Sequence, residues 1–238
     1  SAAVHGDEIN GVEIIRRVTR SLDPRSMAGT VIAVPIVNVH GFLNGDRYLP
    51  DRRDLNRSFP GSEHGSLAGR IANLFMKQIV QRCDVGIDLH TGSDHRTNLP
   101  QIRADLDDPA TRTLAEAFGA PFMMHAKLRD GSMRAAATSK GATVLLYEGG
   151  EAWRFDRAAI DAGVAPVVLR GEPLAAAAGL YHYSVLIGYD ETRRVQEHGI
   201  DVLDVCESAP AQRRGDLGTA KSGLGSSQHT AQGENSTQ

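Results

Sequence analysis

Two histidines and a glutamate stand at points of the sequence where they could bind one divalent cation. His5 and Glu8 bound the tetrapeptide His-Gly-Asp-Glu, and His90 lies in the segment Asp-Leu-His-Thr-Gly. Residues i and i+3 share a helix face, so His5 and Glu8 can reach one ion from the start of a predicted helix. Two neutral imidazoles and one carboxylate, with a fourth position open, are typical of a catalytic zinc site.

A second carboxylate lies close to the third of these residues. Asp88 precedes His90 by two positions, and on a strand this spacing places both side chains on the same side. Asp88 could therefore accept a hydrogen bond from the imidazole N–H that faces away from a metal. The alternative is chance, because the spacing His-x-x-Glu alone is common in proteins that bind no metal.

A basic segment over residues 45–61 offers side chains for an anion. It contains two prolines, which favour a loop over a helix. The planar guanidinium of arginine matches a carboxylate, and Asn56 beside Arg57 adds a neutral donor. A solvated surface loop or a phosphate contact would give the same composition, so the sequence leaves these alternatives open. Its arginines are Arg47, Arg52, Arg53 and Arg57.

Glu148 closes the apolar run Ala-Thr-Val-Leu-Leu-Tyr-Glu and is followed by two glycines. Partial burial at the end of such a strand raises the pKa of a carboxyl group. A raised pKa suits a general base that takes a proton from a metal-bound water and passes it to a leaving amine. A glutamate that only caps a helix or closes a turn is the alternative.

The elements that must position these residues alternate between strands and helices. This alternation predicts an α/β fold, with a mainly parallel or mixed central sheet and helices on both faces. Ligands of such sheets bind at the carboxyl ends of the strands, where His5, His90 and Glu148 all fall. The predicted helices cover residues 8–22, 63–82, 110–118, 131–138 and 154–162, and the predicted strands cover residues 30–39, 84–90, 121–125 and 142–148.

The composition narrows the class of protein. Of the 238 residues, 41% are hydrophobic and 23% charged, which supports a sizeable core in a soluble chain. No stretch approaches the about 18 apolar residues of a membrane span. A net charge of −3 argues against a nucleic-acid partner. Two cysteines are too few for a disulfide scaffold, so we expect a cytoplasmic enzyme or small-molecule binder. The oligomeric state is not predicted.

Four motifs occur in an order that resembles one family. They are HGDE, then RYLPDRRDLNRSFPG, then DLHTG, then a strand that ends in glutamate. This order is similar to that of the succinylglutamate desuccinylase/aspartoacylase family, a branch of the zinc carboxypeptidase superfamily. The resemblance runs from about Val4 to about Gly163. It implies a zinc carboxypeptidase-like fold and hydrolysis of the amide bond of an N-acylated amino acid.

The resemblance also implies the roles of the matched residues at the reacting bond. One zinc ion per chain would be held by His5, Glu8 and His90. Glu148 would be the general base and proton shuttle, and Arg47 would polarise the scissile carbonyl.

The remaining matched residues would bind the substrate. Asn56 and Arg57 match a pair that grips a substrate carboxylate, and Arg134 lies where a further substrate-binding arginine is expected. Arg53 competes with Arg47 for the position at the carbonyl. The implied substrate is a small anionic molecule.

The two ends of the chain depart from the family pattern. We expect that a complete first strand before HGDE and a C-terminal β-rich domain are both missing. We therefore expect a catalytic domain at residues 1–165 that is truncated at its start, an atypical segment at 166–206 and a disordered tail at 207–238. A peptidase of the carboxypeptidase type and a truncated, non-catalytic metal binder are the alternative functions.

Overall fold

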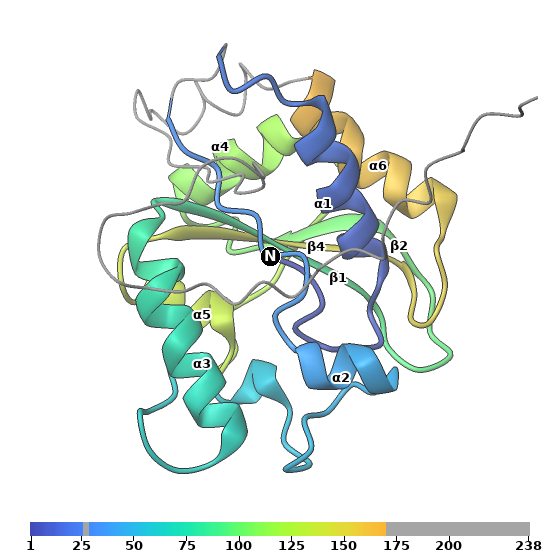
Figure 1. The fold of residues 1–238 in the computed structure, drawn as a ribbon. Coiled ribbons are helices and arrows are strands. Elements are labelled where there is room, and N and C mark those ends of the chain that lie inside the picture. The colour runs from blue at the N-terminus through green and yellow to red at the C-terminus, as the bar shows by residue number, and fades with distance from the viewer. Residues whose placement is uncertain (26–28, 170–238) are drawn as a thin grey trace, which may run out of the picture. The chain divides into compact units, whose positions relative to one another are not determined.

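The computed structural model describes residues 1–25 and 29–169, with side chains described as far as residue 165. Four strands in this part of the chain form one mixed sheet in the order β1-β4-β2-β3 (Figure 1). β1 pairs with β4 and β2 pairs with β3 in parallel, whereas β2 and β4 are antiparallel. The fold is therefore the mixed α/β arrangement that the sequence predicted. The strands are β1 (Val85–Gly92), β2 (Asn98–Ala104), β3 (Phe122–His125) and β4 (Thr143–Glu151).

Helices cover both faces of this sheet. In Figure 1, α1, α4 and α6 lie against one face, and α3 and α5 lie on the other. The α-helices of the described ranges are α1 (Asn10–Ser21), α2 (Val39–Asn44), α3 (Leu67–Gln78), α4 (Pro109–Phe118), α5 (Met133–Thr138) and α6 (Arg157–Leu169). Short 3₁₀ turns occur at Leu55–Arg57 and Val80–Arg82.

The core between the sheet and α1, α4 and α6 consists of apolar side chains with little access to solvent. Ile14 of α1, Phe118 of α4 and Ile160 of α6 pack in one cluster with Leu145 and Tyr147 of β4. Burying each such side chain contributes about 1.5–3 kcal/mol to folding. Alternate residues of a strand face opposite sides, so Leu146 and Glu148 of β4 face away from this core.

The core on the opposite face also holds the arginine-rich segment. Leu49, Leu55 and Phe59 are buried in one cluster with residues of α3 and α5. The Phe59 amide also donates a hydrogen bond of 3.0 Å to the carbonyl of Gly131, directly before α5. Residues 45–61 are therefore anchored by their apolar side chains, and Arg47 and Arg57 of this segment line the cavity described below.

One predicted strand is wrong. Residues 30–38 form no regular strand, and α2 begins at Val39. The run instead lies extended beside the first residues of the chain: Val37 donates to the carbonyl of Ala2, whose own amide donates to the carbonyl of Val34. A β-branched apolar run favours a strand, but residues 30–36 are only partly buried or exposed, and Pro35 lacks the N–H that a continuous ladder needs.

Other elements differ in extent. The predicted helix 63–82 is α3 followed by a 3₁₀ turn, and α6 begins at Arg157 rather than at residue 154. The first helix begins at Asn10, so His5 and Glu8 lie in the turn before it. β2 had no counterpart in the prediction, because Pro100 interrupts the strand pattern in the sequence. In the structure, the pairing of β2 with β4 shifts register between Asn98 and Gln101, on either side of this proline.

The described residues end at 169. The predicted tail 207–238 and nearly all of the predicted segment 166–206 therefore lie outside them. Within the described ranges, none of the helices has the length and apolar character of a membrane-spanning segment.

Candidate active site

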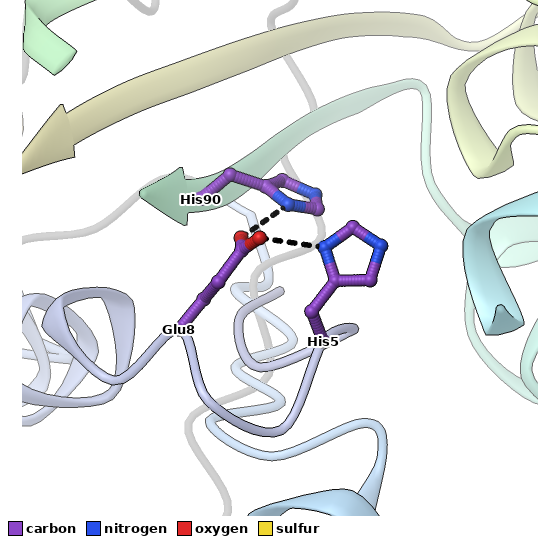
Figure 2. A group of neighbouring side chains, drawn as sticks. All are labelled: His5, Glu8 and His90. Atoms are coloured by element: carbon purple, nitrogen blue, oxygen red, sulfur yellow. Dashed lines mark hydrogen bonds and ion pairs between the residues drawn. The ribbon is translucent and has the colours of Figure 1, made fainter. Parts of the chain in front are cut away.

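His5, Glu8 and His90 converge on one point (Figure 2). The two carboxylate oxygens of Glu8 lie 2.8 Å from His5 Nδ1 and 2.7 Å from His90 Nδ1. The centroids of the two imidazole rings are 5.1 Å apart, and all three side chains are buried. One ligand atom from each residue lies within 4.8 Å of the other two, which is a spacing that could hold a metal ion.

Backbone pairing brings these distant residues together. Residues 1–3 run parallel to β1, through a bridge between Ala2 and Leu89, and the chain then turns at residues 5–8 beside His90. The Glu8 amide donates to the carbonyl of His5 at 3.1 Å, which closes the turn. Gly6 packs directly on α2, since a Cβ there would lie 1.9 Å from the carbonyl carbon of Gly41. Only glycine fits this position.

A carboxylate orients each imidazole from the other side of its ring. His90 Nε2 lies 2.7 Å from Asp88 Oδ2, as the spacing on the strand predicted. His5 Nε2 lies 3.0 Å from Asp54 Oδ1, a partner that the sequence did not suggest. An Nε2–H that donates to a carboxylate leaves Nδ1 as the metal-binding atom. The pair of imidazoles and the Glu8 carboxylate therefore fit the donor set of a divalent cation.

Burial and charge shift the pKa values of these groups in opposite directions. Burial raises the pKa of Glu8, but the two neighbouring imidazoles outweigh it and hold that pKa well below its usual range. Burial lowers the pKa of His90, but Asp88 and Glu8 raise it well above its usual value. The cluster thus favours positive charge between its carboxylates, and a bound cation would displace the imidazole protons.

Glu148 lies next to this cluster, because His90 and Glu148 are register partners on β1 and β4. Its Oε2 accepts a hydrogen bond of 2.7 Å from Asn98 Nδ2, and Arg103 Nη1 lies 3.5 Å from its Oε1. Burial raises its pKa, helped by Glu8 and opposed by His90, Arg103 and Asn98, so the net direction is upward. The direction matches the one predicted for a strand-end carboxyl group.

Arg47 reaches the metal-ligand cluster from the arginine-rich segment. Its Nη1 donates to Glu8 Oε1 at 3.1 Å and its Nη2 donates to Asp54 Oδ2 at the same distance. Arg47 lines the cavity above the cluster, whereas Arg53 is exposed and is not among the described residues that line it. The structure thus places Arg47, and not Arg53, beside the candidate metal site.

The three residues expected to bind substrate also line the cavity, and they differ in burial and in hydrogen-bond partners. Asn56 Oδ1 accepts a hydrogen bond of 2.9 Å from the amide of Met133, which fixes the orientation of the Asn56 amide group. Arg57 is exposed at the cavity rim. The buried guanidinium of Arg134 donates to three backbone carbonyls, of Arg103, Ala126 and Lys127. Arg134 therefore contributes positive charge, with most of its donors already used.

The cavity has a volume of about 430 Å³ and a strongly basic lining. Its acidic residues are Glu8, Asp88 and Glu148, and its basic residues are Arg47, Arg57, Arg96, Arg103, Lys127, Arg129 and Arg134. Such an excess of positive charge attracts anions and is strengthened by a bound cation. The sequence did not predict Arg96, Arg103, Lys127 and Arg129 as part of the site, because only the arrangement of loops and strands brings them together.

The geometry agrees with the match to a family. The model of the succinylglutamate desuccinylase/aspartoacylase catalytic domain matches residues 1–167. The chain belongs to this family. The resemblance predicted from four motifs is confirmed, and the desuccinylase/aspartoacylase domain here carries all four in the predicted order.

One curated relative matches half of this chain. The chain is 37% identical over 124 residues to the N-alpha-acetyl-L-2,4-diaminobutyric acid deacetylase of Halomonas elongata, a match that covers 50% of this chain and 36% of that protein. The chain thus spans about a third of that curated relative.

Solved structures extend the match. The product-bound ectoine utilization protein EutE (DoeB) from Ruegeria pomeroyi superposes with a TM-score of 0.66 and 25% identity, over 81% of this chain and 58% of that one. A succinylglutamate desuccinylase/aspartoacylase from Rhodobacter sphaeroides gives a TM-score of 0.62 and 27% identity, over 77% of this chain and 56% of that one.

Proposed function

We propose that this domain is a zinc-dependent hydrolase that cleaves the amide bond of an N-acylated amino acid. The observation that carries the proposal is the convergence of His5, Glu8 and His90 beside Glu148 and Arg47, at a basic cavity. The matched relatives named as a deacetylase and a desuccinylase support it. The proposed setting is the cytoplasm, and the proposed partner is a small anionic substrate.

The metal would be held by His5 Nδ1, His90 Nδ1 and the Glu8 carboxylate. Bound zinc supplies a Lewis acid that acidifies water and polarises a carbonyl oxygen. Asp54 and Asp88 hold the two rings in the orientation that this requires. Their negative charge would also make the two imidazoles more basic and therefore stronger metal ligands.

Glu148 is the proposed general base and acid. A carboxylate with a raised pKa is a stronger base toward the attacking water, and its protonated form is still acidic enough to pass the proton to the more basic leaving nitrogen. Asn98 and Arg103 restrain its two oxygens separately. Because these partners lie on β2, the proton-transferring group is held by two neighbouring strands rather than by a loop.

Arg47 and the basic lining are proposed to bind the substrate. Arg47 can turn its donors from Glu8 and Asp54 to the carbonyl oxygen, where negative charge develops in the transition state. Asn56 and Arg57, which line the cavity, would bind a carboxylate of the amino acid part. The excess of basic residues favours an anionic substrate that carries at least one carboxylate.

Metal analysis combined with a substrate panel tests the proposal. We expect about one zinc ion per chain, hydrolysis of N-acyl amino acids with acidic groups, and loss of both properties in His90→Ala. Full activity of a metal-free preparation would refute the proposal. Cleavage of C-terminal peptide bonds instead would indicate a carboxypeptidase, and zinc binding without turnover would indicate a non-catalytic metal binder.

A further inference from the structure

Trp153 has an unusual backbone conformation in the turn that follows β4. Its φ angle is 62°, in the left-handed region that bulky residues rarely adopt. The non-glycine residues with positive φ in the described ranges are Ala3, Arg52, His95 and Trp153. Such a conformation persists only where the surrounding contacts enforce it, and it often accompanies a functional constraint.

Three contacts hold Trp153, and each joins it to a different segment of the site. Its backbone N–H donates to the carbonyl of Asp7 at 2.8 Å. Its indole Nε1–H donates to the carbonyl of Gly45 at 2.7 Å. Its ring lies against the imidazole of His95, with the ring centroids 5.9 Å apart.

The first two contacts bear on the metal cluster and on Arg47. The carbonyl of Asp7 belongs to the peptide group that leads into Glu8, in the turn at residues 5–8. Gly45 caps the C-terminus of α2 and precedes Arg47 by two residues. The side chains of Glu8 and Arg47 bond to each other at 3.1 Å, so Trp153 joins the backbones behind two groups that already meet.

The third contact reaches a segment that contributes to the cavity lining. His95 lies in the connection between β1 and β2 and is followed by Arg96, which lines the cavity. Trp153 itself is not among the described residues of the lining. Any effect of Trp153 on the reaction must therefore act through the segments that it joins.

We propose that Trp153 is a positioning residue that fixes the turn at residues 5–8 against the segment that carries Arg47. The inference rests on the proposed function where it concerns zinc, since Glu8 is a proposed ligand. It concerns a residue outside the four motifs of the family. Without the indole, the turn and the end of α2 lose the link through Trp153 and keep only the direct packing of Gly6 on α2, so the cation-binding geometry loosens.

Two variants separate the parts of this contact. Trp153→Gly accepts the positive φ and keeps the backbone N–H, but removes the ring and the indole donor. Trp153→Phe keeps a ring against His95 and removes only the Nε1–H donor. Phe155→Ala changes an exposed aromatic residue two positions away and is the matched control. Phe118→Leu weakens the core on the other face of the sheet and controls for stability.

The dissociation constant for zinc alone, measured by competition with a chelator, is the first readout. We expect Trp153→Gly to weaken zinc binding about tenfold, as loss of support behind a metal ligand does. Trp153→Phe should give a smaller loss. Phe155→Ala and Phe118→Leu should bind zinc as the parent does, although Phe118→Leu unfolds at a lower temperature. Parent-like zinc affinity in Trp153→Gly, or an equal loss in Phe118→Leu, would overturn the inference.

Hydrogen exchange of the metal-free chain is the second readout and needs no zinc. Trp153→Gly should exchange severalfold faster than the parent in peptides covering residues 5–9 and 41–48, and unchanged in α4. Unchanged exchange in those two peptides would also overturn the inference. If the parent binds no zinc, the proposed function fails, while exchange still decides whether Trp153 positions the turn.

Discussion

The two histidines of the candidate metal site have the same bonds but depend on different parts of the fold. In each, Nδ1 faces Glu8 and Nε2 faces an aspartate. For His90 that aspartate is Asp88, two residues away on the same strand and almost fully buried. For His5 it is Asp54, 49 residues away in the arginine-rich segment. We call Asp88, His90 and Glu148 the strand half of the site, and His5, Arg47 and Asp54 the loop half.

The difference lies in how each half is kept in place. Strand spacing places Asp88 beside His90, the Ser1 hydroxyl donates to Asp88 Oδ1 at 2.8 Å, and ladder pairing adds Glu148. The loop half depends on the buried anchors Leu49, Leu55 and Phe59, far from the metal ligands in sequence. Asp54 bonds to both His5 and Arg47, so it links the metal ligands to the substrate side. A substitution in the strand half should therefore affect only the residue that is changed. A substitution in the loop half should disturb His5, Arg47 and Asp54 together.

The largest effect should come from the strand half. Glu148→Gln removes the proposed proton carrier without removing a metal ligand, so hydrolysis should fall at least about a hundredfold. Zinc stoichiometry should stay at the parental value. Turnover numbers and metal content of the same samples check this. Loss of zinc together with activity would make Glu148 part of the metal site rather than the base.

Replacing the two aspartates separately should separate the halves. Asp88→Asn and Asp54→Asn should each weaken zinc binding about 10–100-fold, since each removes the charge behind an imidazole. Asp54→Asn should also lower kcat with saturating zinc, because Arg47 loses a partner. Asp88→Asn should then recover most of its kcat. Equal kcat values in saturating zinc would show that Asp54 has no second role.

Matched core substitutions should show that the loop half depends on its anchors. Leu55→Ala and Leu114→Ala each empty a fully buried leucine site and should each cost about 2–5 kcal/mol of stability. Only Leu55→Ala, which lies beside Asp54, should also lower kcat/KM measured per folded molecule. Denaturant unfolding gives the folded fraction for the correction. A similar loss in Leu114→Ala would remove the distinction.

The smallest effect concerns the pH dependence set by Glu148. The active carboxylate of Glu148 is protonated as the pH falls through its pKa. Because that pKa is raised, the acid limb of kcat/KM should lie above pH 4.5, the usual pKa of a glutamate. Asn98 bonds to the ionised form and lowers this pKa. Asn98→Ala should therefore move the acid limb to higher pH, by about one unit or less. A limb that moves to lower pH would contradict the assignment.

The sequence predicted the strand half better than the loop half. Residues at i and i+2 of a strand share a side, so Asp88 was expected beside His90, and the strand-end rule brought His5, His90 and Glu148 together. Nothing local shows that Asp54 meets His5, because that contact depends on how the apolar anchors fold the segment. Asn98 and Arg103 were missed with β2, whose proline and register shift hide the strand. The wrong strand at 30–39 shows that a β-branched apolar run by itself predicts neither burial nor a regular strand.

X-ray absorption at the zinc edge of the loaded chain tests most directly whether two imidazoles and one carboxylate bind the ion. We expect two imidazole nitrogens at about 2.0–2.1 Å, no sulfur ligand, and one imidazole fewer in whatever zinc His5→Ala retains at excess metal. A spectrum with a sulfur ligand at about 2.3 Å, or one that His5→Ala leaves unchanged, would contradict the account.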